Sequence, residues 1–133
     1  MTAVLHINPE SLHVNPAFTQ VIRVPAGHDT IHVGGQNGVG PDGQLVGPGM
    51  AEQAKQAMAN LQACLEAAGA ELADVVEWRV LCVEGAPLRE GFAAFAVWPR
   101  DAAPPAVTVA MVAGLAIPGA LVEIAATAAA APR

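Results

Sequence analysis

The clearest hydrophobic pattern in the sequence is a stripe of apolar residues between positions 54 and 68. Its members recur three or four positions apart, which is the spacing of one face of an α-helix. They are Ala54, Ala57, Met58, Leu61, Cys64, Leu65 and Ala68. The stripe predicts a helix that begins near Gly49 and is capped at its C-terminus by Gly69. Cys64 is expected to be buried with the rest of the stripe.

Shorter stretches with strand-like alternation, rich in Val and Ile, predict six strands. They span residues 4–7, 19–24, 30–33, 74–83, 106–112 and 121–128. The second and third flank a turn at residues 25–29, so we expect them to pair as a β-hairpin. A second, shorter helix is expected to begin near Pro87, and residues 129–133 are expected to fray. The order β-β-β-α-β-α-β-β predicts an α+β domain with two helices on one face of a sheet.

Two of these strands predict how the sheet meets its surroundings. The strand 74–83 is expected to place Val76, Trp78, Val80 and Cys82 on one face, and Val75, Glu77, Arg79, Leu81 and Val83 on the other. The strand 106–112 is apolar on both faces, because Val107, Val109 and Met111 alternate with Ala110 and Val112. Its second face must also be buried, and neighbouring copies of the chain are the most economical cover. The pattern therefore predicts a self-assembled oligomer.

The composition agrees with assembly and excludes several classes of partner. Charged residues make up 14% of the chain, against about 25% in an average globular protein. The net charge is −6 and the six Lys and Arg residues are scattered, which argues against nucleic acid and against an anionic membrane surface. The uncharged stretch 102–122 is long enough to span a bilayer, but its prolines and glycines favour two strands joined by a turn.

The two cysteines and the N-terminus indicate the cellular compartment. Cys64 and Cys82 both fall within apolar patterns, and we interpret them as apolar fillers rather than as nucleophiles or a disulfide. Free buried thiols suit a reducing cytosol. Residues 1–7 lack the cationic start and long apolar core of a signal peptide. We therefore expect a cytoplasmic protein.

Three motifs have structural interpretations that we prefer to functional ones. The glycines of residues 38–43 fit G-x-G-x-x-G, but the following helix begins too late for a dinucleotide site, so a turn-rich loop is favoured. His28 and His32 lie across a turn, with no further ligand at suitable spacing. Ser11 is the only serine and has no setting for nucleophilic catalysis. We expect neither a metal nor a cofactor.

Glu123 is the most unusual ionisable residue. It is the lone charge in a strand whose neighbours are Leu121, Val122 and Ile124. A carboxylate in such surroundings must be paired, hydrogen-bonded or part of a site. Two interpretations remain open: a functional carboxylate, or a structural ion pair at a subunit contact, for example with Arg79.

Several segments, taken in order, resemble the signature sequences of the RidA/YjgF family. They are 32–38 (HVGGQNG), the helix 54–69 with its EAAG end, 74–76 (DVV), 105–106 (PA), 112–115 (VAGL) and 118–124 (PGALVEI). The resemblance covers roughly residues 15–128 and is weak at 1–14 and 129–133. We therefore treat residues 1–133 as a single domain of this kind.

The resemblance implies a fold, an assembly and an activity. It implies a chorismate-mutase-like α+β fold and a homotrimer whose sheets pack into a central barrel, with three ligand clefts between subunits. The best-known activity of the family is hydrolysis of reactive imines and enamines, such as 2-aminoacrylate, to keto acids and ammonia. Some members are also labelled endoribonucleases, a label that the acidic composition does not support.

The resemblance also assigns site residues. Glu123 matches the carboxylate that is thought to position water, and Gly35 matches a glycine that contributes its backbone. The remaining cleft positions are Phe18 in place of Tyr, Gly34 in place of Ser, Gln36, Val109 in place of a frequent Cys, and Val107 in place of Arg. The family's arginine grips the substrate carboxylate with two hydrogen bonds, which valine cannot do.

The missing arginine leaves three hypotheses for function. The leading one is a trimeric, RidA-like protein that binds a small molecule in apolar inter-subunit clefts and either hydrolyses a non-standard imine, enamine or carbonyl metabolite or only binds it. The second is an ordinary 2-iminobutanoate/2-iminopropanoate-type deaminase in which Arg100 replaces the missing arginine. The third is a non-catalytic structural or regulatory trimer.

Overall fold

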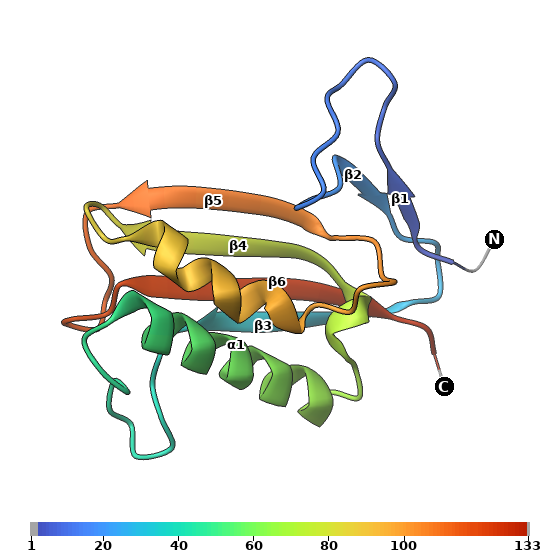
Figure 1. The fold of residues 1–133 in the computed structure, drawn as a ribbon. Coiled ribbons are helices and arrows are strands. Elements are labelled where there is room, and N and C mark those ends of the chain that lie inside the picture. The colour runs from blue at the N-terminus through green and yellow to red at the C-terminus, as the bar shows by residue number, and fades with distance from the viewer. Residues whose placement is uncertain (1–2, 133) are drawn as a thin grey trace.

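The structure, a computed structural model, describes residues 3–132 and contains a four-stranded sheet, a separate two-stranded sheet and helices on one side (Figure 1). The elements are β1 (Leu5–Ile7), β2 (Val21–Arg23), β3 (Asp29–Gln36), α1 (Met50–Ala67), the 3-10 helix η1 (Leu72–Asp74), β4 (Val75–Val83), the 3-10 helix η2 (Leu88–Val97), β5 (Ala106–Val112) and β6 (Val122–Ala130). This confirms the predicted α+β class and element order. No helix within residues 3–132 is long and apolar enough to cross a membrane.

The main sheet has the strand order β3-β6-β4-β5, with β6 and β4 at its centre. β6 runs antiparallel to both of its neighbours, whereas β4 and β5 run parallel. A parallel pair needs a crossover connection, and η2 with its flanking loops supplies it. Figure 1 shows α1 and η2 side by side on the same face of this sheet, as the sequence predicted.

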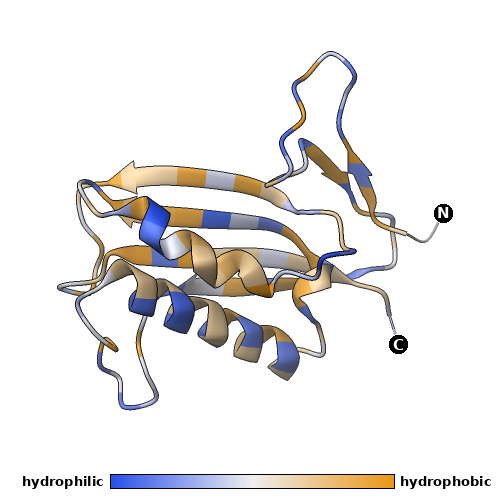
Figure 2. Cartoon of the chain, in the orientation of Figure 1, coloured by the Kyte–Doolittle hydropathy of each residue, from blue (hydrophilic) through white to orange (hydrophobic). Residues whose placement is uncertain are grey.

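Glycines flank the covering helix α1 at positions 49 and 69. The Glu52 side chain accepts a hydrogen bond from the Gly49 N–H at 2.8 Å, which satisfies a backbone donor at the helix start. Gly69 follows the helix with a φ of +80°, a conformation that favours glycine. Met58, Leu61 and Leu65 form the buried row against the sheet. Figure 2 shows the resulting division of α1 into hydrophilic and apolar parts.

The prediction that Cys64 is buried was wrong, because Cys64 is exposed. The buried row runs through positions 54, 57, 58, 61 and 65, and position 64 lies at its flank. Cys82 on β4 is buried as expected, and burial raises the pKa of its thiol. The helix stripe in the sequence was therefore wider than the part of the helix that packs on the sheet.

The pairing of the N-terminal strands also differs from the prediction. β2 pairs with β1, with Leu5 opposite Arg23, instead of forming a hairpin with β3. β3 pairs with β6, from Asp29 opposite Ala130 to Gln36 opposite Ile124. The chain between β2 and β3 thus connects two sheets. Residues 129 and 130 belong to β6 because β3 pairs with them, so the expected fraying was wrong for these two residues, and residue 133 lies outside the described residues.

The predicted faces of β4 hold except at its start. Trp78, Val80 and Cys82 are buried beneath the helices, whereas Glu77 and Arg79 lie on the opposite face. Val75 is buried as well, at 1% exposure, although the alternation placed it on the other face. An irregularity in the pairing of β4 with β6 between Val75 and Glu77 shifts the alternation by one position there.

Candidate functional site

The carboxylate of Glu123 lies directly over Gly35. A Cβ atom built on Gly35 would fall 2.6 Å from the Glu123 carboxyl carbon, far inside van der Waals contact. The same atom built on Gly34 would meet nothing within 4 Å. Gly35 therefore leaves room for this carboxylate, whereas its neighbour faces open space. The two residues come from adjacent strands, β3 and β6, at the point where the β3 register shifts between Val33 and Gln36.

Glu123 is half-buried, and its carboxylate has no hydrogen-bond or ion-pair partner among the described residues. It stands opposite Leu81 of β4, on the sheet face that the helices leave open. Within one chain Glu123 forms no ion pair with Arg79, and a pair with the Arg79 of a neighbouring copy stays a prediction. Arg79 instead donates to Glu77 at 2.6 Å, two positions away on the same strand. Within one chain, the Glu123 carboxylate is thus available for a ligand, for water or for a neighbouring copy.

A buried polar network holds the backbone on both sides of this site. Gln53 of α1 is fully buried; its amide nitrogen donates to the carbonyls of Gly47 and Gly119, and its amide oxygen accepts from the Leu121 N–H at 2.8 Å. The Asn37 side chain, next after β3, donates to the Val122 carbonyl at 3.0 Å. These bonds fix the start of β6 against β3. They position Glu123 without contacting it.

A second feature lies on the helix-covered face, where η2 passes the edge strand β5. It is an apolar groove of about 480 Å³. Its walls are formed by Pro16, Ala17, Phe18, Trp78, Val80, Leu88, Phe92, Phe95, Trp98, Pro104, Pro105, Val107 and Val109. None of these described residues is charged. We call this feature the aromatic groove.

Three rings form the inner wall of the aromatic groove. The ring centroids of Trp78 and Phe95 lie 5.2 Å apart, as do those of Trp78 and Trp98, and both pairs meet edge to face. This is a favoured geometry for aromatic rings. The Trp98 indole N–H donates to the Ala102 carbonyl at 3.1 Å. At the mouth of the groove, Phe92 and Val109 remain 57% and 50% exposed.

The seven site residues suggested by the resemblance fall into two groups that do not meet within one chain. Phe18, Val107 and Val109 line the aromatic groove. Glu123, Gly34, Gly35 and Gln36 lie where β3 joins β6. Strand register separates the groups: Val109 stands opposite Val80 and shares the covered face, whereas Glu123 stands opposite Leu81 on the open face.

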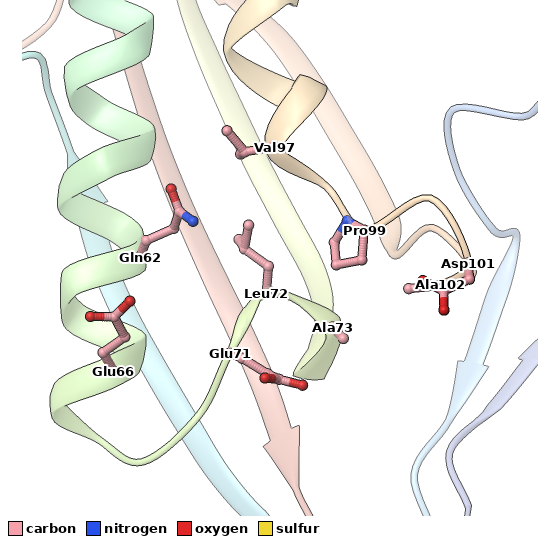
Figure 3. Close-up of a pocket in the computed structure, with 9 residues that line it drawn as sticks. All are labelled: Gln62, Glu66, Glu71, Leu72, Ala73, Val97, Pro99, Asp101 and Ala102. Carbon is pink, nitrogen blue, oxygen red and sulfur yellow. The ribbon is translucent and has the colours of Figure 1, made fainter.

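A further depression, shown in Figure 3, lies beyond the C-terminal half of α1. Its nine lining residues include the carboxylates Glu66, Glu71 and Asp101 around Leu72. None of the seven site residues suggested by the resemblance lines this depression. Among residues 3–132 no three His, Cys, Asp or Glu side chains are grouped as a metal site. The glycines of residues 38–43 form a loop, closed by a bridge between Val39 and Leu45.

Comparison with known proteins identifies the family. The family model described as Endoribonuclease L-PSP matches residues 10–130, which is most of the chain. The chain belongs to this family, the RidA/YjgF family.

Solved structures and curated proteins agree with this membership of the RidA family. YyfB from Yersinia pestis, a protein of unknown function of the conserved Rid family, has 33% identity and a TM-score of 0.84, covering 96% of this chain and 98% of that one. RidA from the Antarctic bacterium Psychrobacter sp. PAMC 21119 has 26% identity and a TM-score of 0.66, covering 90% and 98%. The 2-iminobutanoate/2-iminopropanoate deaminase of Rattus norvegicus is 45% identical over 69 residues, or 51% of this chain. The chain spans about half the length of this curated relative, at 48%.

The inner wall of the aromatic groove is the part of this candidate site that sequence reasoning missed. Trp78 was placed correctly on the buried face of its strand, but no sequence pattern linked it to Phe95 or Trp98. The available signal was composition: this chain has only five Phe and Trp residues, three Phe and two Trp, and all five line one groove.

Proposed function

We propose that the chain is a RidA-like homotrimer that binds a small carbonyl or imine metabolite in clefts between subunits and hydrolyses the imine. The observation that carries this proposal is the Glu123 carboxylate over Gly35, half-buried and without a partner among the described residues. Family membership supports it, and so does the name of the rat relative, an imine deaminase. No cofactor is needed for the reaction.

The separation of the two residue groups supports a site shared between subunits. The aromatic groove and the Glu123 group lie on opposite faces of one sheet, so a ligand that contacts both must touch two chains. The open face around Glu123 carries Leu81 and Ala110 as cross-strand neighbours, and such half-apolar faces are stable when neighbouring copies cover them. In the proposed trimer, the groove of one copy meets the Glu123 group of the next.

In the proposed reaction, Glu123 acts first as a base and then as an acid. It accepts a proton from a water molecule, whose oxygen bonds to the imine carbon and gives a tetrahedral carbinolamine. The nitrogen takes up the proton held by Glu123. The carbon–nitrogen bond then breaks as the carbinolamine hydroxyl passes its own proton, by way of the regenerated carboxylate, to the nitrogen, which leaves as ammonia. The products are one carbonyl compound and one ammonia for each imine and water consumed. The backbone of Gly35 is close enough to help position the water.

The test removes or displaces the carboxylate without disturbing the fold. Glu123→Gln keeps the shape of the side chain but cannot accept a proton, so imine hydrolysis should fall by about 10²- to 10⁴-fold. Gly35→Ala should also slow the reaction, because its methyl group occupies the carboxylate position. Gly34→Ala adds the same methyl group in open space and should cost less. The rate is measured on imines without a carboxylate, generated in solution by an amine oxidase.

Mass and melting temperature are measured on the same variants, with Glu84→Gln as the exposed carboxylate control. Both quantities should stay near the parent values for Glu123→Gln. If the variant loses its assembly while turnover per intact trimer is unaltered, Glu123 is a structural residue and the proposed hydrolysis loses its main support.

A second candidate is hydrolysis of 2-imino acids, the activity named for the rat relative, and the identity of 45% over 69 residues favours it. That activity needs a cation for the substrate carboxylate. Position 107 carries Val, and Arg100 is exposed and does not line the aromatic groove. If 2-imino acids are nevertheless hydrolysed rapidly and Arg100→Ala abolishes the activity, this second candidate is correct.

A further inference from the structure

The aromatic groove points to the chemical class of the ligand. We propose that it binds the uncharged, ring-bearing end of a carbonyl compound or its imine, so that the ligands of this protein are neutral aromatic ketones, aldehydes and imines. This inference rests on the proposed function, because it assigns a substrate class to the same cleft. It also goes further, since it predicts that a carboxylate on the substrate is a disadvantage.

The shape of the aromatic groove suits a planar ring. Its inner wall is built in advance by Trp78, Phe95 and Trp98, whose edge-to-face contacts fix the angles between the rings. The volume of about 480 Å³ falls within the range of small-molecule sites, about 300–1,000 Å³. A ligand ring can enter by the same edge-to-face or offset contacts that already join the wall residues. Phe92 and Val109, each half-exposed, leave the mouth open.

The polar chemistry of the groove disfavours an anionic ligand group. No charged side chain of the described residues lines it. The inner wall has two indole N–H donors. That of Trp98 already binds the Ala102 carbonyl, and that of Trp78 has no hydrogen-bond partner among the described residues. At the rim, the carbonyls of Pro104 and Pro105 accept from the hydroxyl and the N–H of Thr19. A carboxylate placed here would lose its water without gaining a cation, and one neutral indole N–H replaces only a small part of its hydration.

Position 107 determines this preference. Val107 stands opposite Trp78 on the covered face and lines the groove. An arginine at this position would introduce a permanent charge with five donors, which suits a carboxylate. With Val107 the same wall is apolar. The residue therefore acts as a specificity determinant between charged and neutral ligands of similar size.

The test uses four ketones as stable substitutes for imines, in which the carbonyl oxygen takes the place of the imine nitrogen. Benzylacetone has a ring and no charge, and α-keto-γ-phenylbutyrate has the same ring and a carboxylate. Butanone and α-ketobutyrate repeat the pair without the ring. Both tryptophans of the chain line the groove and the chain has no tyrosine, so its intrinsic fluorescence reports on this groove alone.

We expect benzylacetone to change the tryptophan emission in a saturable manner and to bind at least tenfold more tightly than α-keto-γ-phenylbutyrate. The two ketones without a ring should cause no saturable change at the same concentrations. Val107→Arg should reverse the order of the two ring compounds. Val46→Arg adds the same charge to an exposed loop residue outside the groove and should leave both affinities unchanged.

Two results would overturn the inference. One is tighter binding of α-keto-γ-phenylbutyrate than of benzylacetone by the parent protein. The other is no binding of benzylacetone, together with a red-shifted tryptophan emission when the protein is diluted to monomer, because a neighbouring copy would then fill the groove. Neither result bears on Glu123-dependent hydrolysis of imines, which is measured separately. Conversely, benzylacetone binding without any hydrolysis would support the groove and contradict the proposed function.

Discussion

The two faces of β6 show how differently this chain treats adjacent residues of one strand. Val122, Ile124, Ala126 and Ala128 face the helices and are at most 2% exposed. Between them, Glu123, Ala125 and Thr127 face away from the helices and are only half-buried. The chain completes the first face by itself with α1 and η2. The second face has strand neighbours but no covering layer within the chain. The Glu123 carboxylate, which we propose acts on the ligand, lies on this face.

This contrast indicates that the two faces of β6 have different roles. The covered face is made of aliphatic side chains that need only be packed, and substitutions there should act on folding. The open face mixes a carboxylate, a hydroxyl and small apolar groups, and substitutions there should act on assembly or chemistry. The contrast fails if both faces respond in the same way.

The largest effect on folding is expected from Ile124→Ala on the covered face. Ile124 is fully buried beneath the helices, so truncation removes packed methyl groups and leaves a cavity. The free energy of unfolding should fall by about 2–5 kcal/mol. Denaturant unfolding, followed by the fluorescence of the two tryptophans, measures this change.

Thr127→Ala on the same strand provides the matched comparison. Thr127 is half-buried on the open face, so its truncation should change the free energy of unfolding by less than about 1 kcal/mol. An equal loss in both variants would mean that the open face is packed as tightly in solution as the covered one.

A charged residue on the open face should change assembly more than folding. Ala110 lies opposite Leu81 on this face, where the proposed trimer buries it. Ala110→Lys should reduce the particle mass from about three times 13.5 kDa to a single chain, because an unpaired ammonium is costly to bury. Light scattering after size-exclusion chromatography measures the mass.

Ala113→Lys adds the same charge just beyond β5, at an exposed position, and should leave the mass unchanged. A parent protein that is already a stable monomer would remove the proposed trimer and the shared cleft with it.

The sequence predicted the positions of helices and strands well, but it predicted less well which strands pair with each other. The α1 stripe and the alternation on β4 arise from the residues themselves, so their positions could be predicted. The pairing of β2 could not, because a turn of Gly27 and its neighbours suits both a hairpin and a connection between sheets. The choice is made by β6, a distant strand whose backbone pairs with β3 up to Ala130. Such long-range pairing leaves no local signal.

The candidate site was predicted as a set of residues but not as an arrangement. The segment PGALVEI placed Glu123, and HVGGQ placed Gly35, and the structure brings these two into contact. Val107 and Val109 came from the same resemblance, yet they lie on the opposite face of the sheet. Strand register decides this, and register is fixed only when neighbouring strands are known. The groove wall of Trp78, Phe95 and Trp98 was missed for the same reason.

The smallest effect is expected from modification of the two thiols. Their reaction rates distinguish the covered face of the sheet from the outer surface of α1. Cys82 is buried on the covered face, whereas Cys64 is exposed. A thiol reagent should therefore modify Cys64 quickly in the folded protein and Cys82 only at the rate of unfolding. Cys64→Ser should remove the fast phase and leave the slow one. Rapid modification of both thiols would mean that β4 is not sealed beneath the helices.

The raised pKa of Cys82 also predicts a weak dependence of stability on pH. Burial disfavours the thiolate, so the native pKa exceeds that of the unfolded chain. The stabilising contribution is complete below the unfolded thiol pKa, at about 8.5, and is lost as pH rises toward the native value, because only the unfolded chain releases the proton. Between those limits the free energy of unfolding of the parent should fall with pH more steeply than that of Cys82→Ala. Equal slopes would show that the Cys82 thiol ionises as readily in the folded protein as in the unfolded chain, and that water reaches the covered face.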